Sequence, residues 1–281
     1  MRNVVDSGWL AERLNNPDVV VADCRFVLGQ PDAGQTAYDQ GHIPGAVYFH
    51  LDRDLSAPVG MHGGRHPLPD FGIFAKTAGQ AGIDETKTVV VYDDQGGAMA
   101  SRLWWMLRYA GHDNVYLLDG GYSSWQAAGY PTTTEQAQPK ETAFTVNVRS
   151  EMLLSMEDVK SRIGKPGTTI IDSREPRRYL GLEEPIDRAA GHIPGAVNRF
   201  WKDALDETGR WKGQDGQAAR FAGLNPDDEI VVYCGSGVTA CPNVLALMEA
   251  GFRNVKLYGG SWSDWVSYAE NPIATGDEEK A

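Results

Sequence analysis

The strongest constraint on this chain is that one seven-residue segment occurs twice. "GHIPGAV" occupies residues 41–47 and again residues 191–197. Other matched segments occur in the same order: "VVVADCR" pairs with "TTIIDSR", and "NVYLLDGGYSSW" pairs with "NVKLYGGSWSDW". A repeat of this length predicts two tandem domains rather than a solenoid of short units.

The two copies are expected to be separate domains joined by a polar linker. The stretch "TTTEQAQPKETA" at residues 132–143 contains a proline and shows no hydrophobic periodicity. We therefore place the first domain at residues 1–135, the linker at 136–150 and the second domain at 151–281. In a chain of 281 residues, each domain is long enough to bury its own core.

Short runs rich in β-branched residues alternate with helical patterns in both copies. In the first copy we expect strands at residues 19–23, 88–92 and 115–118, and helices at 7–14, 98–109 and 122–128. Strands that are apolar throughout and alternate with helices indicate a parallel sheet covered on both faces. The sequence therefore predicts an α/β protein with two tandem α/β/α domains, each built on a central parallel sheet.

The composition narrows the possible partners and compartments. A net charge of −12 argues against nucleic acid, which requires a basic surface. No run approaches the roughly 18 apolar residues that a membrane span needs, and the first residues lack the apolar core of a signal peptide. Three cysteines are too few for a disulfide framework or a four-cysteine zinc site. We expect a cytoplasmic protein without nucleic-acid or membrane partners and without a metal.

One cysteine stands at a position suited to chemistry. Cys234 follows the apolar run at residues 229–233, and ligands bind beyond the carboxyl ends of strands in open parallel sheets. Gly235 and Gly237 allow backbone torsions that turn successive N–H groups toward one centre. Proline is tolerated only in the first turn of a helix, so Pro242 predicts that the next helix begins near residue 238 or 239.

This loop favours a reactive thiol over a buried structural one. Converging N–H groups and a helix start stabilise an anion, and therefore the thiolate of Cys234. Aligning Tyr92 with Tyr233 puts Asp93 at the cysteine position of the first copy, so only the second copy can perform thiolate chemistry. We interpret Cys241 as a buried hydrophobic residue and Cys24 as structural.

Taken together, two copies of "GHIPGA", a loop cysteine only in the second copy and the loop "CGSGVT" resemble the tandem-domain rhodanese family of sulfurtransferases. The resemblance covers essentially the whole chain. It implies that Cys234 takes a sulfane sulfur from a small-molecule donor as a persulfide. The sulfur then passes to a thiol acceptor, such as thioredoxin or a small thiol, or to cyanide, with no cofactor.

The resemblance also suggests the donor. The neutral loop "CGSGVT" is similar to that of the 3-mercaptopyruvate branch of the family, whereas thiosulfate-preferring relatives carry basic loop residues. A dianion gains more from a positive loop than a monoanionic keto acid does. Thiosulfate remains the alternative donor.

Further site residues follow from the resemblance alone. It implies that Ser236 acts with an Asp and a His of the first copy, which map to Asp52 and to His66, with His62 as the rival histidine. The loop residues that would contact the donor are Gly235, Gly237, Val238 and Thr239.

Basic residues are expected to hold the donor carboxylate, because a guanidinium can bind it with two hydrogen bonds. "RRYLG" resembles the substrate-binding segment of the family and identifies Arg178. The second arginine of the mercaptopyruvate branch would fall on Asp187, so Arg188 beside it is the weaker candidate. We expect Arg174 to form a structural ion pair with Asp172 or Glu175.

Two other classes of function are less well supported by the residues. Cysteine-dependent phosphatases on related folds carry an arginine six positions after the cysteine, and here that position is Ala240. A non-enzymatic sulfur-relay or binding module would generally lose the cysteine, as the first copy has done. The retained Cys234 therefore favours an enzyme.

Overall fold

The computed structural model describes residues 3–277 and divides the chain into two compact units. The first unit contains the residues up to Ala57, Leu68–Arg149 and a short excursion at Leu205–Trp211. The second contains Pro58–Pro67, Ser150–Ala204 and the residues from Lys212 onward. Each unit therefore includes a segment that the linear sequence places in the other copy.

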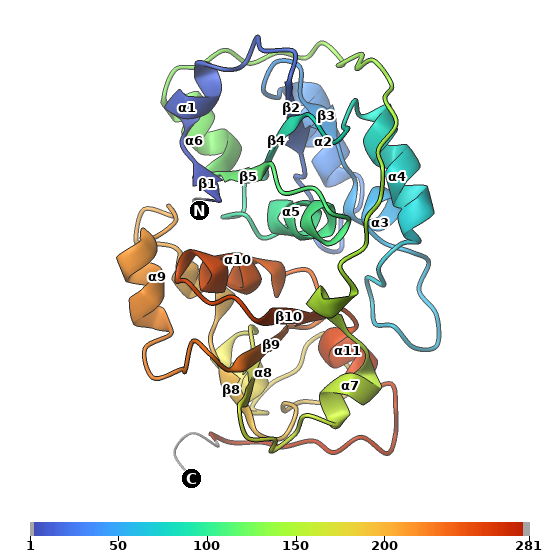
Figure 1. Ribbon diagram of the computed structural model, residues 1–281, viewed down its shortest axis with the longest axis vertical. Helices are drawn as coiled ribbons and strands as arrows, with labels where there is room; N and C mark the ends of the chain where they lie inside the picture. Colours follow the sequence, from blue (N-terminus) through green and yellow to red (C-terminus); the bar gives the residue numbers. More distant parts are fainter. Residues whose placement is uncertain (1–2, 278–281) are drawn as a thin grey trace. The chain divides into compact units, whose positions relative to one another are not determined.

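The first unit is an α/β structure, drawn in blue to green in Figure 1. Its elements are β1 (Val4–Val5), α1 (Ser7–Ala11), β2 (Val19–Asp23), α2 (Ala33–Gln40), β3 (Val47–Tyr48), α3 (Leu51–Asp54), α4 (Phe71–Gln80), β4 (Thr88–Tyr92), α5 (Ala100–Tyr109), β5 (Val115–Leu118) and α6 (Gly121–Ala127).

The second unit repeats this order with small differences (Figure 1). Its elements are the 3-10 turn η1 (Ser150–Met152), β6 (Leu153–Leu154), α7 (Met156–Lys160), β7 (Thr168–Asp172), α8 (Pro176–Tyr179), β8 (Ala196–Asn198), the 3-10 turn η2 (Trp201–Ala204), α9 (Gln214–Arg220), β9 (Glu229–Tyr233), α10 (Cys241–Glu249), β10 (Val255–Tyr258) and α11 (Ser261–Trp265).

Each unit is built on a five-stranded sheet in which every pairing is parallel. The strand orders are β1-β5-β4-β2-β3 and β6-β10-β9-β7-β8, so the two sheets have the same topology. In the first, Val19 pairs with Thr88 and Asp23 with Tyr92 over the full length of β2 and β4. The predicted α/β class with a central parallel sheet in each copy is confirmed.

Helices cover both faces of each sheet. Side chains along a strand alternate between the two faces, so an apolar strand presents apolar side chains on both, and each face needs a helix to bury it. In the first unit, Val90 of β4 packs with Leu10 of α1 and Trp125 of α6 in one buried cluster. Val89 and Val91, also fully buried, belong to the opposite face of the strand, and α5 packs on β4 and β5. The second unit uses α7 and α11 for the corresponding cluster.

The repeated "GHIPGAV" segment has a structural role in both copies. His42 stacks on Tyr38 with ring centroids 3.8 Å apart, and its Nδ1 hydrogen-bonds the Tyr38 carbonyl at 2.7 Å. In the second copy, His192 stacks on Tyr179 at 3.9 Å and makes the same 2.7 Å contact. These two buried histidines therefore hold the segment before β3 and β8 in place.

An arginine and an aspartate at the end of the second strand form a buried pair in each copy. Arg174 binds Asp172 with two nitrogens, the shorter contact being 2.6 Å, as expected from the sequence. Arg25 and Asp23 repeat the arrangement, again at 2.6 Å. Because a buried charge is costly unless it is paired, these pairs stabilise the ends of β7 and β2 only as intact units.

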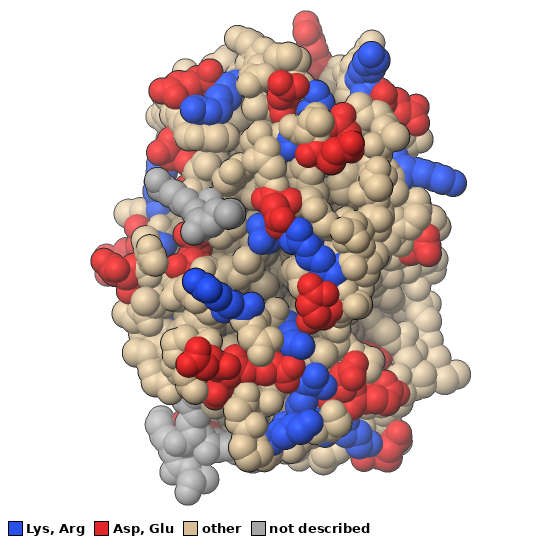
Figure 2. Space-filling model, in the orientation of Figure 1, with Lys and Arg blue, Asp and Glu red and all other residues tan. Residues whose placement is uncertain are grey.

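No helix among residues 3–277 is both long enough and apolar enough to cross a bilayer. On the face that Figure 2 displays, basic side chains lie among acidic ones rather than apart from them. This face therefore shows no separate basic patch of the kind that a polyanionic partner would need.

Candidate active site

Cys234 lies directly after β9, at the carboxyl end of the sheet of the second unit. Its backbone N–H donates to Ser261 Oγ at 3.1 Å, and its carbonyl accepts from the N–H of Trp262 at 2.9 Å. The residue is only 1% exposed. The cysteine is therefore held against the start of α11, and Ser261 has a φ of 57° at this junction.

The helix after the cysteine loop begins later than expected. α10 starts at Cys241, not at residue 238 or 239, and Pro242 lies in its first turn as proposed. Residues 235–240 form turns instead, and the Val238 carbonyl accepts from the N–H of Cys241 at 3.1 Å. The aligned loop of the first copy also stays non-helical up to α5, which begins at Ala100, because its N–H groups bind one carboxylate instead of preceding carbonyls.

The first copy shows where those N–H groups point. Asp93, which aligns with Cys234, is 1% exposed, and its two carboxylate oxygens accept four backbone hydrogen bonds of 2.8 to 2.9 Å. The donors are the N–H groups of Gln95, Gly97, Met99 and Ala100. This loop is a cradle for an anion, and in the first copy the chain supplies the anion itself.

In the second copy, three of the four corresponding donors have no partner among residues 3–277; the fourth, the N–H of Cys241, donates to the Val238 carbonyl. Among residues 3–277, the N–H groups of Ser236, Val238 and Ala240 donate to no protein group. These positions align with Gln95, Gly97 and Met99, which all bind the carboxylate in the first copy. Because Cys234 stands in place of that carboxylate, the cradle suits a thiolate or a group carried on its sulfur.

His66 reaches the cysteine loop. Its Nδ1 and Ser236 Oγ are hydrogen-bonded at 2.8 Å, and both residues are 7% exposed. The rival, His62, stacks on Tyr268 with ring centroids 3.9 Å apart and contacts Ser267 Oγ at 2.7 Å. Of the two histidines, His66 is therefore the one in contact with the loop serine.

Asp52, the third member of the predicted relay, lies in α3 of the first unit and is exposed. Its backbone N–H donates to His50 Nδ1 at 3.1 Å, which caps the short helix. Its participation in a relay with His66 stays a prediction.

Arg178 of α8 lies at the cysteine loop and is held by two acids. Its Nε and Nη2 donate to Glu184 at 3.1 and 2.7 Å, and Nη2 also donates to Asp187 at 3.0 Å. A methyl group placed on Gly235 would lie 3.6 to 3.7 Å from the Arg178 guanidinium nitrogens. The predicted donor-binding arginine is thus beside the residue that follows Cys234.

A second arginine at this place was missed by the sequence reasoning. Arg65 comes from the Pro58–Pro67 segment, forms an ion pair with Asp187, and has its Nη2 2.8 Å from the same methyl position on Gly235. Burial lowers the pKa of Arg65, the Cys234 charge acts in the opposite direction, and Arg178 adds to the lowering. Only its position next to His66 in "GGRHPLP" could have drawn attention to it.

Arg188, the predicted second clamp, is exposed. It lines a cavity of about 400 Å³ in the second unit together with Arg65 and Asp187. Beside Gly235 the structure places Arg65 and Arg178, and a donor-binding role for Arg188 stays a prediction.

Comparison with known proteins agrees with this geometry. The family model described as "Rhodanese-like domain" matches the chain twice, over residues 6–128 and 155–268. The chain belongs to the rhodanese family. Both rhodanese-like domains therefore fall on the two parallel sheets, and the second contains the cysteine loop.

Relatives of this rhodanese chain carry two kinds of sulfurtransferase name. It is 44% identical to the "Probable 3-mercaptopyruvate sulfurtransferase" of Pseudomonas aeruginosa, covering 95% of this chain and 96% of that one. It is 33% identical to the "Thiosulfate sulfurtransferase" of Mus musculus, covering 100% and 98%. The crystal structure of the Escherichia coli 3-mercaptopyruvate sulfurtransferase SseA aligns with a TM-score of 0.80 at 34% identity, covering 94% of this chain and all of that one.

The other two cysteines of this rhodanese chain are buried. Cys241 is fully buried and its Sγ lies 3.4 Å from the Gly237 carbonyl, which confirms that it is a buried residue. Cys24 is 1% exposed, and burial raises the pKa of its thiol, with the charge of Asp23 adding to the effect. All three thiols are free, and the described residues contain no cluster of three or more His, Cys, Asp or Glu side chains able to hold a metal.

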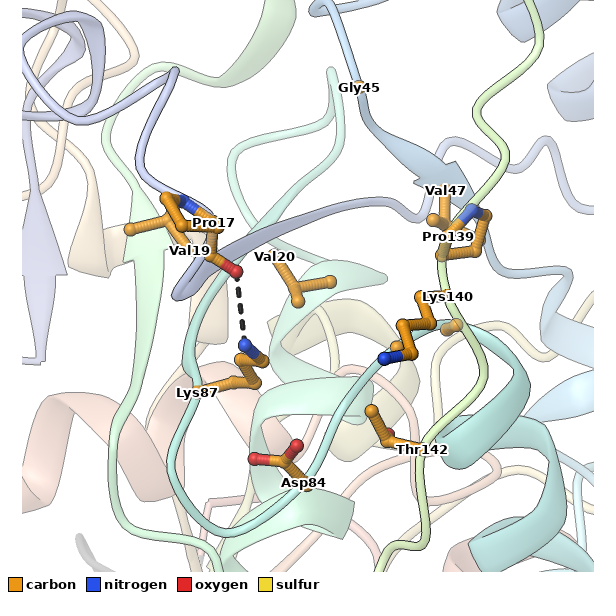
Figure 3. Close-up of a pocket in the computed structure, with 12 residues that line it drawn as sticks. Pro17, Val19, Val20, Gly45, Val47, Asp84, Lys87, Pro139, Lys140 and Thr142 are labelled. Carbon is orange, nitrogen blue, oxygen red and sulfur yellow. Dashed lines mark hydrogen bonds between the residues drawn. The ribbon is translucent and has the colours of Figure 1, made fainter.

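A separate cavity of about 470 Å³ lies in the first rhodanese-like domain (Figure 3). Val19 and Val47, which begin β2 and β3, line it, so it lies at the amino ends of the strands and not at the end that carries Asp93. Its Lys87 is engaged by the Pro17 carbonyl and by Asp18, both at 3.1 Å. This cavity therefore lies at the opposite end of the strands from the loop that binds the Asp93 carboxylate.

Proposed function

We propose that this rhodanese-family chain is a sulfurtransferase that moves sulfur from 3-mercaptopyruvate to a thiol or cyanide through a persulfide on Cys234. The observation that supports it most is the pair of matched loops. One binds the Asp93 carboxylate with four N–H groups, and the other carries Cys234 next to three corresponding N–H groups that no acceptor among residues 3–277 uses. The same geometry that holds a carboxylate would hold an anionic sulfur.

In the first step the Cys234 thiolate attacks the sulfur of the donor. A sulfur–sulfur bond forms, the carbon–sulfur bond breaks, and its electron pair leaves on the carbon as the enolate of pyruvate. The enolate takes up the proton that the donor thiol releases, so pyruvate and a cysteine persulfide result. The hydrogen-bonded pair of Ser236 and His66 is suited to move this proton, with Asp52 as the proposed third member.

In the second step the acceptor regenerates the enzyme. Cyanide attacks the outer sulfur, the sulfur–sulfur bond breaks, and its electron pair returns to Cys234 as thiolate while thiocyanate leaves. A thiol such as thioredoxin or a small thiol takes the same sulfur as its own persulfide. The cradle N–H groups stabilise the anion on the cysteine in both steps. The persulfide intermediate divides one sulfur transfer into two easier steps.

The charges around the loop support a monoanionic donor over thiosulfate. The ion-paired cluster contains three guanidinium groups and three carboxylates: Arg65, Arg174, Arg178, Asp172, Glu184 and Asp187. A cluster with a net charge near zero gives a dianionic donor less electrostatic stabilisation than a basic loop would give it. Thiosulfate is the second candidate donor, because relatives of similar coverage carry that name. Free, buried cysteines support a reducing cytoplasm as the compartment.

The test uses the full chain with each donor in turn and mass spectrometry of the protein. Incubation with 3-mercaptopyruvate should add one sulfur atom to the parent protein and none to Cys234→Ser, a substitution that keeps the side-chain size. Ser236→Ala should fold normally, lower the turnover number roughly 10- to 100-fold with 3-mercaptopyruvate, and change thiosulfate turnover less, because thiosulfate releases no thiol proton. A Cys234→Ser protein that transfers sulfur as well as the parent would refute the mechanism.

A further inference from the structure

The start of α11 fixes the backbone of the cysteine loop. The N–H of Trp262 donates to the Cys234 carbonyl at 2.9 Å, and the N–H of Ser263 donates to the Gly235 carbonyl at 2.9 Å. Ser261 Oγ accepts from the N–H of Cys234 at 3.1 Å. Three successive residues of this helix therefore determine where the nucleophile lies.

Side chains of the same helix hold the segment that precedes His66. Asp264 Oδ1 accepts from the N–H of Gly63 at 2.7 Å. Ser263 Oγ accepts from the N–H of Arg65 at 3.1 Å. Ser263 therefore joins two parts of the site, because the cysteine loop uses its N–H and this segment uses its hydroxyl.

Gly64 brings this segment into close contact with the residue that precedes α11. It has a φ of 80°, which favours glycine, and a methyl group there would overlap the Gly260 carbonyl. Two positions later, the Nδ1 of His66 and Ser236 Oγ are hydrogen-bonded at 2.8 Å. A side chain at position 64 would therefore push the segment, and His66 with it, away from the helix.

Asp264 is the buried member of this anchor. It is 5% exposed, and its second oxygen accepts from the hydroxyl of Tyr258, the last residue of β10, at 2.7 Å. Its carboxylate therefore connects the carboxyl end of a sheet strand to the segment that carries His66. The first copy supplies this segment, and the second copy supplies the acid that holds it.

Resting on the proposed function, we infer that Asp264 is a positioning residue of the reaction, although it touches no reacting atom. It holds residues 63–66 on α11 and thereby keeps His66 at hydrogen-bonding distance from Ser236. Because the same helix fixes Cys234, the nucleophile and the pair that moves the proton share one support. A displacement of about 1 Å at such a pair can cost about 100-fold in rate.

The test measures the turnover number of full-length variants at saturating donor, with cyanide as acceptor. Asp264→Ala removes the acceptor of the Gly63 N–H, and Gly64→Ala displaces the same segment without changing any residue of α11 or of the cysteine loop. Each should lower the turnover number with 3-mercaptopyruvate roughly 10- to 100-fold. Turnover with thiosulfate, which releases no thiol proton, should fall less than about threefold.

Two conservative variants separate positioning from a general loss of structure. Tyr258→Phe removes the other partner of the Asp264 carboxylate and leaves the Gly63 contact in place. It should lower Tm but keep the turnover number within about twofold of the parent. Asp264→Asn keeps an oxygen for the Gly63 N–H and turns its NH₂ group toward the Tyr258 oxygen, so turnover should recover to within about fivefold of the parent.

A double variant tests whether Asp264 acts through His66. In a His66→Ala background, adding Asp264→Ala should lower the turnover number less than about threefold further, because the effects of residues that act as a unit do not multiply. Effects that multiply, a Gly64→Ala protein with the parent's turnover number, or equal losses with both donors would overturn the inference. If the parent formed no persulfide with 3-mercaptopyruvate, or if His66→Ala kept the parent's turnover number, the proposed function would fail instead.

Discussion

Asp93 offers the sharpest test of the idea that the loop is an anion cradle. One carboxylate oxygen accepts from Gln95 and Gly97, and the other accepts from Met99 and Ala100. In Asp93→Asn, one of these oxygens becomes an NH₂ group whichever way the amide is turned. Two buried N–H groups must then face another donor rather than an acceptor.

The size of the effect follows from those two donors. A buried N–H without an acceptor costs about 1–3 kcal/mol, so two cost about 2–6 kcal/mol. Part of this cost is offset, because the amide does not bury the negative charge that the Asp93 carboxylate buries. That buried charge is unfavourable, and burial accordingly raises the pKa of the Asp93 carboxyl. We expect a net loss of about 2–4 kcal/mol in the free energy of unfolding of the first unit. At about 2–4 °C per kcal/mol, its transition should fall by about 5–15 °C.

The assay is calorimetry together with urea unfolding, which is monitored by tryptophan fluorescence. The neighbouring residue, Asp94, provides the control. Asp94 is exposed and, within the described part of the chain, accepts only from the N–H and Oγ of Ser123, at 2.8 and 2.9 Å. Asp94→Asn should therefore cost less than about 1 kcal/mol. If Asp93→Asn were no more destabilising than Asp94→Asn, the four N–H contacts would not form a cradle that requires an anion.

Two further predictions concern the backbone and the pH dependence. Gly237 has a φ of 76°, and a Cβ there would overlap the Gly259 carbonyl. Gly237→Ala should therefore lower the free energy of unfolding, measured by urea titration, by at least about 2 kcal/mol. Gly235→Ala is the control: its Cβ would meet only a flexible guanidinium, so the loss should be less than about 1 kcal/mol. The hydrogen bond from Arg162 lowers the pKa of Glu229 in the folded protein. The Glu229 carboxylate therefore stabilises the fold at pH values above its unfolded pKa of about 4.3. This stabilisation is lost as the pH falls through the lower pKa of the folded protein. Glu229→Gln should therefore reduce Tm at pH 7, with a loss of at most about 1 kcal/mol in the free energy of unfolding. The difference from the parent should shrink as the pH falls below the unfolded pKa, and a difference that stays constant with pH would contradict the assignment.

Much of the fold follows from local patterns in the sequence. The strands predicted at residues 19–23, 88–92 and 115–118 are confirmed residue for residue, because each is an apolar run bounded by polar or turn residues. β1 and α2 were not predicted. β1 has two residues, too few to show a period, and the eight residues of α2 bury only Gly34 and Tyr38, so no apolar stripe marks them.

The site was predictable only in part, for a different physical reason. Cys234, Ser236 and Arg178 stand in recognisable local motifs, and His66 could be chosen among two candidates. Arg65 depends on contacts between segments about 170 residues apart, which no local periodicity or turn signal encodes. The late start of α10 was missed because Pro242 restricts only how far before it the helix can begin. It does not determine whether the loop residues before Cys241 are helical.

The exchange of segments between the two copies has a consequence for how the chain is made. His66 lies 170 positions before its partner Ser236, and at about 5–20 residues per second a ribosome needs roughly 10–35 s to cover that distance. During this interval Pro58–Pro67 has left the exit tunnel without the surface it packs on, while the first unit still lacks Leu205–Trp211. Neither unit can therefore acquire its full set of contacts during synthesis until most of the other has emerged, so both units are completed only late in translation.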